Sequence, residues 1–72
     1  MEKLPPQNIE AERSVIGSML MDKDAIVNVS GWLLPEHFYD DRNAKIYKVI
    51  VDLFLDNIPV DLVTVADKLN KE

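Results

Sequence analysis

Apolar residues recur at every third or fourth position along most of the chain, which is the spacing of one buried face of a helix. The pattern predicts four helices, over about residues 9–21, 24–31, 41–56 and 62–72. The one short β-branched stretch, residues 58–60, has a proline at its centre, which argues against a strand. We therefore expect an all-α fold, a small bundle of about four to five helices. Residues 1–8 would form an extended amino-terminal arm and residues 9–72 a helical head.

Residues that stabilise helix ends stand where these segments begin and stop. Asn8 is placed to cap the first helix, the pair Asp40-Asp41 the third and Asp61 the fourth, because their side chains accept hydrogen bonds from free backbone amides. Asn57 follows the third helix and tolerates the left-handed backbone that commonly ends one. The predicted boundaries therefore rest on capping chemistry as well as on periodicity.

The third helix is predicted to lie at the centre of the domain. Its polar residues occupy only a narrow arc, and apolar side chains take the remainder, which is more than a peripheral helix needs. Val51 and Leu55 lie at the edge of this wide apolar arc and form a possible partner surface. In the alternative interpretation, the fourth helix or the arm around Leu4 covers them.

Glu12 falls inside the apolar arc of the first helix. A carboxylate buried without partners is costly, so we predict that Glu12 accepts hydrogen bonds, and otherwise that the arc is locally open to water. Candidate donors are backbone amides at a neighbouring helix start, the hydroxyl of Tyr47 or Tyr39, or the guanidinium of Arg42. Gly17 lies on another face of the same helix, where a missing side chain would let a neighbour approach closely.

Composition narrows the possible functions. The 72 residues carry 8 basic and 13 acidic side chains, a net charge of −5, which disfavours direct DNA binding and favours protein partners. There is no cysteine, which agrees with a cytoplasmic location and excludes a thiolate metal site. No apolar run approaches the ~20 residues of a membrane span.

The residues offer no catalytic arrangement. His37 is the only histidine and lies in the predicted connector, so we interpret it as structural or solvated, with a partner contact as the alternative. Helix capping explains Asp40-Asp41 better than a metal pair does. No glycine-rich phosphate loop occurs, because Gly17 and Gly31 are isolated. We expect these residues to supply no catalysis, no cofactor site and no metal site.

Six short motifs follow one another from Leu4 to Leu69. They are Pro5-Pro6, Glu10-Ala11-Glu12, Gly17, Phe38-Tyr39, Ile46-Tyr47, and Pro59-Val60-Asp61 continuing through Leu62-Val63-Thr64. Their order and spacing resemble the amino-terminal domain of bacterial replicative DNA helicases of the DnaB type. The departures are small: the family often has Gly where Asn57 or Ile58 stands, and Gln at Arg13.

The resemblance implies a function that the residues alone do not. The parent protein would be a hexameric helicase that unwinds duplex DNA with ATP and Mg²⁺, bound in a domain beyond Glu72. The amino-terminal domain would form the collar of the ring, support ring assembly and recruit primase; a helicase loader is a further possible partner. A helical hairpin, through which neighbouring subunits pair, would also lie beyond Glu72. We therefore expect these residues to be monomeric or weakly self-associating.

Two other interpretations compete with this one. The helicase-binding domain of bacterial primase shares the fold, but Met1 looks like a native start and the Pro-Pro to Glu-Ala-Glu opening favours the helicase. A free-standing acidic helical adaptor, or a mimic of nucleic acid, agrees with the net charge, but a mimic would need denser and more regular carboxylates.

Overall fold

A computed structural model describes residues 9–71 of the chain. Their elements in order are α1 (Ile9–Met21), α2 (Lys23–Ser30), the 3-10 turn η2 (Pro35–His37), α3 (Asp41–Leu55) and α4 (Leu62–Lys71). These residues contain no strand, and the predicted all-α class is confirmed. The predicted extended arm and the predicted cap at Asn8 lie outside the described residues.

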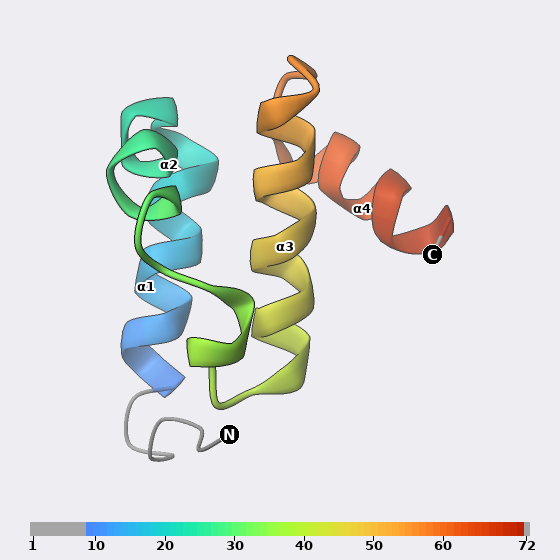
Figure 1. Ribbon diagram of the computed structural model, residues 1–72. Coiled ribbons are helices and arrows are strands. Elements are labelled where there is room, and N and C mark those ends of the chain that lie inside the picture. The colour runs from blue at the N-terminus through green and yellow to red at the C-terminus, as the bar shows by residue number, and fades with distance from the viewer. Residues whose placement is uncertain (1–8, 72) are drawn as a thin grey trace.

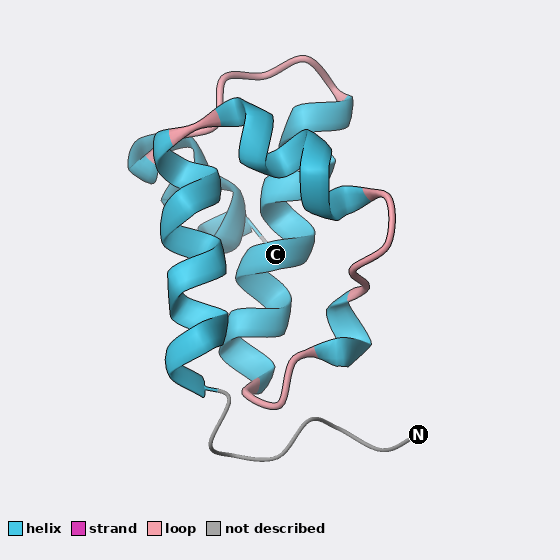
Figure 2. Cartoon of the chain, turned by 90° about the vertical axis from the view of Figure 1, so that its left-hand side faces the viewer, coloured by secondary structure: helices cyan, strands magenta, loops and turns pink. Residues whose placement is uncertain are grey.

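The helices α1 and α3 stand side by side and run in the same direction (Figure 1). The chain reverses between them through α2 and a connector that descends along the bundle and contains η2 (Figure 2). Because α3 contacts α1, α2, η2 and α4, it is the central helix, as its wide apolar arc predicts.

The core gathers side chains from every described α-helix and from the connector. Its buried apolar members are Ile16, Met19, Ile26, Phe38, Tyr47, Val49, Ile50, Leu53 and Val65. Four of the nine belong to α3, so this helix contributes more buried side chains to the core than any other element. Burial of such side chains is the main favourable contribution to folding in a domain that has no disulfide.

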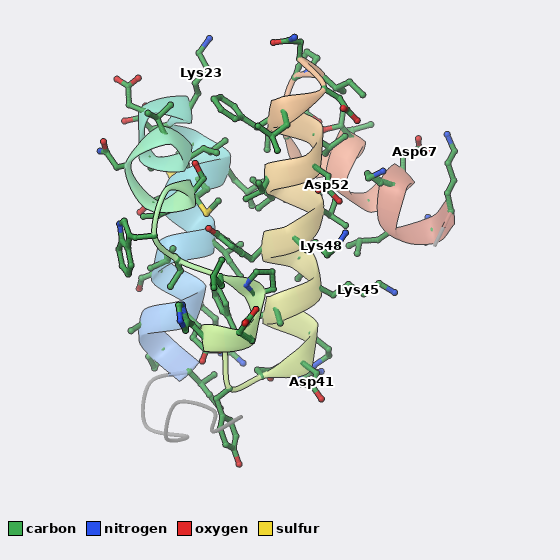
Figure 3. All side chains as sticks on the ribbon, viewed as in Figure 1. Lys23, Asp41, Lys45, Lys48, Asp52 and Asp67 are labelled. Atoms are coloured by element: carbon green, nitrogen blue, oxygen red, sulfur yellow. The ribbon has the colours of Figure 1, made fainter. Side chains whose placement is uncertain are left out.

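The narrow polar arc of α3 faces solvent. Lys45 is exposed and extends away from α1, and Lys48 donates to Asp52 across one turn at 2.9 Å (Figure 3). Exposed pairs of this spacing stabilise a helix only slightly. The arc therefore mainly provides the solvent-exposed side of the central helix.

Neither glycine is required by a close neighbour or by a left-handed backbone. A Cβ atom built at Gly17 would meet nothing within 4 Å, so the predicted close approach of a neighbour is wrong for the described residues. Gly17 instead lies half-buried on α1 with space around it. Gly31 ends α2 with a φ of −76°, a conformation that any residue adopts.

The start of α2 is held by Asp22, whose side chain accepts a hydrogen bond from the amide of Asp24 at 2.9 Å.

The end of α3 is a Schellman turn. Asn57 has a φ of 61°, the left-handed conformation that its position predicts. Its amide donates to the carbonyl of Phe54 at 3.1 Å, and the amide of Ile58 donates to Leu53 at 3.0 Å. Both bonds satisfy carbonyls that the helix end would leave without partners.

The start of α4 is held by a reciprocal pair of hydrogen bonds. Asp61 accepts from the amide of Thr64 at 2.9 Å, and the Thr64 hydroxyl accepts from the amide of Asp61 at 3.0 Å. The hydroxyl also donates to the carbonyl of Pro59 at 2.8 Å. The predicted capping role of Asp61 is therefore confirmed, and the turn between α3 and α4 is fixed at both ends.

Helix α4 packs on α3 through only part of its apolar face, which comprises Leu62, Val65, Ala66 and Leu69. Val65 is buried and Leu69 half-buried, but Leu62 and Ala66 are exposed. One neighbouring helix, α3, thus covers part of this apolar face and leaves the rest open.

We predict that position 57 tolerates Gly but not a β-branched residue. Asn57→Val should lower the free energy of unfolding by about 1–2 kcal/mol, because a branched side chain is strained in the left-handed region. Asn57→Gly should be at least as stable as the parent. Urea unfolding followed by far-ultraviolet circular dichroism measures both, and equal stabilities for Val and Gly would contradict the prediction.

Candidate functional site

The carboxylate of Glu12 joins α1 to the beginning of α3. Its side chain is buried, with the residue 4% exposed. Oε2 accepts from the amide of Tyr39 at 2.6 Å, while Oε1 accepts from the amide of Asp40 at 3.3 Å and from Nδ2 of Asn43 at 3.1 Å. The prediction that Glu12 is hydrogen-bonded by backbone amides at a helix start is confirmed. We call these four residues the Glu12 cluster.

Asn43 is the member of the Glu12 cluster that sequence reasoning missed. It is buried in the first turn of α3, one turn before Tyr47 and two before Ile50, on the buried face of the helix. A polar residue at an apolar position of that face is the signal that could have found it. Of the other proposed donors, the Tyr47 hydroxyl donates instead to the carbonyl of Leu33 at 2.6 Å.

Phe38 and Tyr47 fix the connector against the central helix. Their ring centroids lie 5.0 Å apart with a tilt of 32°, within the range of favourable aromatic pairs. Both rings are buried, and burial raises the pKa of the Tyr47 phenol. Since the same phenol is bonded to the Leu33 carbonyl, Tyr47 anchors both ends of the connector to α3.

Asp40 is the N-cap of α3. Its Oδ1 accepts from the amides of Arg42 at 2.8 Å and Asn43 at 3.3 Å, and its Oδ2 pairs with the Arg42 guanidinium at 3.2 Å. The side-chain hydrogen bond from Arg42, followed by the backbone bond from the same residue, lowers the pKa of Asp40. The predicted cap is confirmed at Asp40, with Asp41 as the first helical residue. The predicted donor Arg42 binds Asp40 and not Glu12 in this arrangement.

His37 has a local structural contact. Its Nδ1 accepts from the amide of Leu34 at 3.0 Å, which closes the 3-10 turn, and the residue is half-buried. Among residues 9–71, no three His, Cys, Asp or Glu side chains gather in a way that could hold a metal ion. The contacts that the described residues do make, from the Glu12 carboxylate and the rings of Phe38 and Tyr47, position the helices and the connector.

A family model described as the DnaB-like helicase N terminal domain matches residues 4–72. The chain belongs to this family. It is 44% identical over 69 residues to the replicative DNA helicase DnaB of Rhodothermus marinus, which covers 96% of this chain and 7% of that protein. It is 43% identical over 68 residues to the DnaB of Geobacillus stearothermophilus, covering 94% of this chain and 15% of that protein.

A solved structure gives the same result for this DnaB-type chain. The crystal structure of the N-terminal domain of DnaB helicase from Mycobacterium tuberculosis is similar with a TM-score of 0.87 and 44% identity, over 94% of this chain and 47% of that one. The fold and the sequence family therefore agree. The chain spans 15% or less of the length of the two curated relatives and about half of the solved domain.

The DnaB-type motif residues divide between the core and the surface. Glu12, Phe38 and Tyr47 are buried, and Gly17, Ile46, Val60 are half-buried, whereas Glu10, Ala11, Tyr39, Pro59 and Asp61 are exposed. Pro6 lies outside the described residues. The buried members belong to the Glu12 cluster or to the aromatic pair, so their structural role is visible. The exposed Tyr39 side chain is available to a partner, while its own amide is bound to Glu12.

The possible partner surface of the DnaB-type chain is only partly open. Val51 is half-buried against the core, whereas Leu55 at the end of α3 is 69% exposed. Helix α4 therefore does not cover Leu55, and the arm around Leu4 lies outside the described residues. An open hollow of about 470 Å³ lies nearby, between the α1–α2 corner and the segment 57–60 that follows α3.

We predict that Glu12→Leu destabilises this DnaB-type domain more than Glu12→Gln. Leucine leaves two partly buried amides and the buried Asn43 side chain without an acceptor, at a cost of about 1–3 kcal/mol in the free energy of unfolding. Glutamine retains one acceptor oxygen and should cost less. Urea unfolding measures both variants. The control is Glu10→Leu, an exposed residue in the same turn, which should cost only about 0.3–1 kcal/mol.

A result in which Glu12→Leu equals or exceeds the parent in stability would contradict the role of the Glu12 cluster. Equal losses for Glu12→Leu and Glu10→Leu would also contradict it, because both would then report only the lost charge at the helix start.

Proposed function

We propose that this chain serves as part of the N-terminal assembly and interaction domain of a hexameric replicative DNA helicase. The observation that carries the proposal is the family match across residues 4–72, together with the TM-score of 0.87 to a DnaB N-terminal domain. The net charge of −5 supports a role in binding protein and not the phosphate backbone of DNA. The domain would support ring assembly and the recruitment of primase at the replication fork.

The helicase activity would belong to the longer protein. The curated relatives of this chain carry the name replicative DNA helicase DnaB, and the chain matches only a small share of their length. In this proposal, other parts of such a protein bind ATP and Mg²⁺ and unwind duplex DNA. The sequence supports this division, because it has no glycine-rich phosphate loop and its described residues form no metal-binding cluster.

The partners in this proposal are other helicase subunits, primase and a helicase loader, all in the cytoplasm. None of the helices described between residues 9 and 71 is both long and apolar enough to cross a membrane.

Val51 and Leu55 form the proposed partner surface, with exposed Leu55 as its centre. The alternatives, a primase helicase-binding domain or a free-standing acidic adaptor, have less support, because the matched relatives are helicases.

We predict no measurable binding of single-stranded DNA by this chain near physiological salt. Neutralising phosphates requires a basic surface, and acidic residues outnumber basic ones by 13 to 8. Fluorescence anisotropy of a labelled oligonucleotide is the measurement. A salt-sensitive dissociation constant in the low micromolar range would contradict the proposal that the chain acts through protein partners alone.

We predict that the chain binds the carboxy-terminal helicase-binding domain of primase and that Leu55→Ser weakens this binding by about tenfold. Exposed apolar anchors of interfaces commonly contribute this much, since a tenfold change is about 1.4 kcal/mol. Val27→Ser is the matched control, because Val27 is an exposed branched residue on α2. Titration calorimetry measures all three proteins.

Two outcomes would count against this part of the proposal. Absence of binding by the parent chain would remove primase as a partner of these residues. Equal affinities for Leu55→Ser and the parent would move the partner surface away from the end of α3.

A further inference from the structure

A small groove lies between the first turns of α1 and the segment that follows α2. Ala11 and Val15 line it from α1, and Trp32, Leu33 and Phe38 line it from that segment. Its volume is about 140 Å³, and the exposed atoms of its lining are all apolar. We call it the Trp32 groove. Such a groove accepts small apolar side chains and offers a ligand neither a charge nor a free hydrogen-bonding group.

Trp32 is the largest side chain of the groove, and it is held in place while most of its surface is open. The residue is 65% exposed, and its indole Nε1 donates to the carbonyl of Asn28 at 3.0 Å. Because the N–H already has its acceptor, covering the ring costs it no hydrogen bond. A fixed, open aromatic ring is the kind of surface on which interface contacts are commonly anchored.

The other polar side chains beside the Trp32 groove also have partners. Both carboxylate oxygens of Glu12 accept hydrogen bonds within the Glu12 cluster. Nδ1 of His37 accepts from the amide of Leu34 at 3.0 Å. An apolar occupant would therefore leave these bonds intact, so its burial would not be offset by the loss of a buried polar contact.

The sequence just before α1 supplies an occupant of matching chemistry. Leu4, Pro5 and Pro6 are uncharged and apolar. Consecutive prolines favour the polyproline II conformation, and such segments bind grooves lined by aromatic rings at a low entropic cost. Proline also has no amide that needs an acceptor, which suits a groove without exposed polar atoms. We propose that the segment Leu4-Pro5-Pro6 packs in the Trp32 groove and covers the ring of Trp32.

The length of the arm favours this groove over the larger hollow at the α1–α2 corner. The chain from Pro6 to Ile9 spans at most about 11 Å when extended, and Ala11 lies in the first turn of α1. Because α1 has 13 residues and is about 20 Å long, its far end is beyond the reach of Pro6 (Figure 1). A tethered segment also has a high effective concentration, so it binds through a small surface more readily than a second copy does. The inference does not depend on the proposed binding of primase.

The fluorescence of Trp32 tests the proposal, because it is the only tryptophan of the chain. The parent chain is compared with a variant that lacks residues 1–6 and keeps Gln7 and Asn8 before α1. The acrylamide quenching constant should be at least about twofold larger in the truncated variant, since a packed ring is reached only when its contact opens. Its emission should also shift to longer wavelength, as the ring is then surrounded by water. Circular dichroism verifies that both proteins are folded.

Two double variants of full length separate the prolines from the rest of the arm. Pro5→Ser with Pro6→Ser should be quenched like the truncated variant. The matched control, Glu2→Ser with Lys3→Ser, changes the arm outside the proposed contact and should be quenched like the parent. Equal quenching of the parent and the truncated variant would overturn the proposal, and so would equal effects of the two double variants. Quenching of the parent that decreases as its concentration rises would also overturn it, because the arm of a second copy would then be the occupant.

Discussion

The buried carboxylate of Glu12 is the constraint on which the arrangement of the helices depends. It accepts from Tyr39, Asp40 and Asn43, residues 27 to 31 positions later in the chain. A carboxylate removed from water must keep such partners, so α1 and the first turn of α3 are held in one relative position. Apolar packing between the same helices is less directional and would tolerate small shifts that these bonds do not.

The Glu12 cluster also determines the directions in which the side chains of the adjacent residues Phe38 and Tyr39 point. Because the amide of Tyr39 is bound to Glu12, the backbone at this point has a fixed orientation. The ring of Phe38 then turns inward against Tyr47, and the side chain of Tyr39 turns outward to solvent. Two neighbouring residues of one family motif thus have different roles, one in the core and one on the surface.

The sequence predicted most of the fold because its signals were local. Periodicity and capping residues identified the helices, the left-handed Asn57 and the cap at Asp61, each determined by neighbours within a few positions. The need of Glu12 for donors was also predictable, since it follows from burial alone. Prediction failed where the answer depends on distant packing: the space beside Gly17, and Asn43 as a partner of Glu12.

The one-sided attachment of α4 has a consequence for how the domain opens. Helices α1 and α3 are joined by the core and by the Glu12 cluster, whereas α4 packs chiefly against α3 and contributes one buried side chain, Val65. Few buried contacts mean a small free energy of local opening. We therefore expect α4 to open locally at a lower free energy than α1 and α3, so that its backbone amides exchange hydrogen faster than theirs.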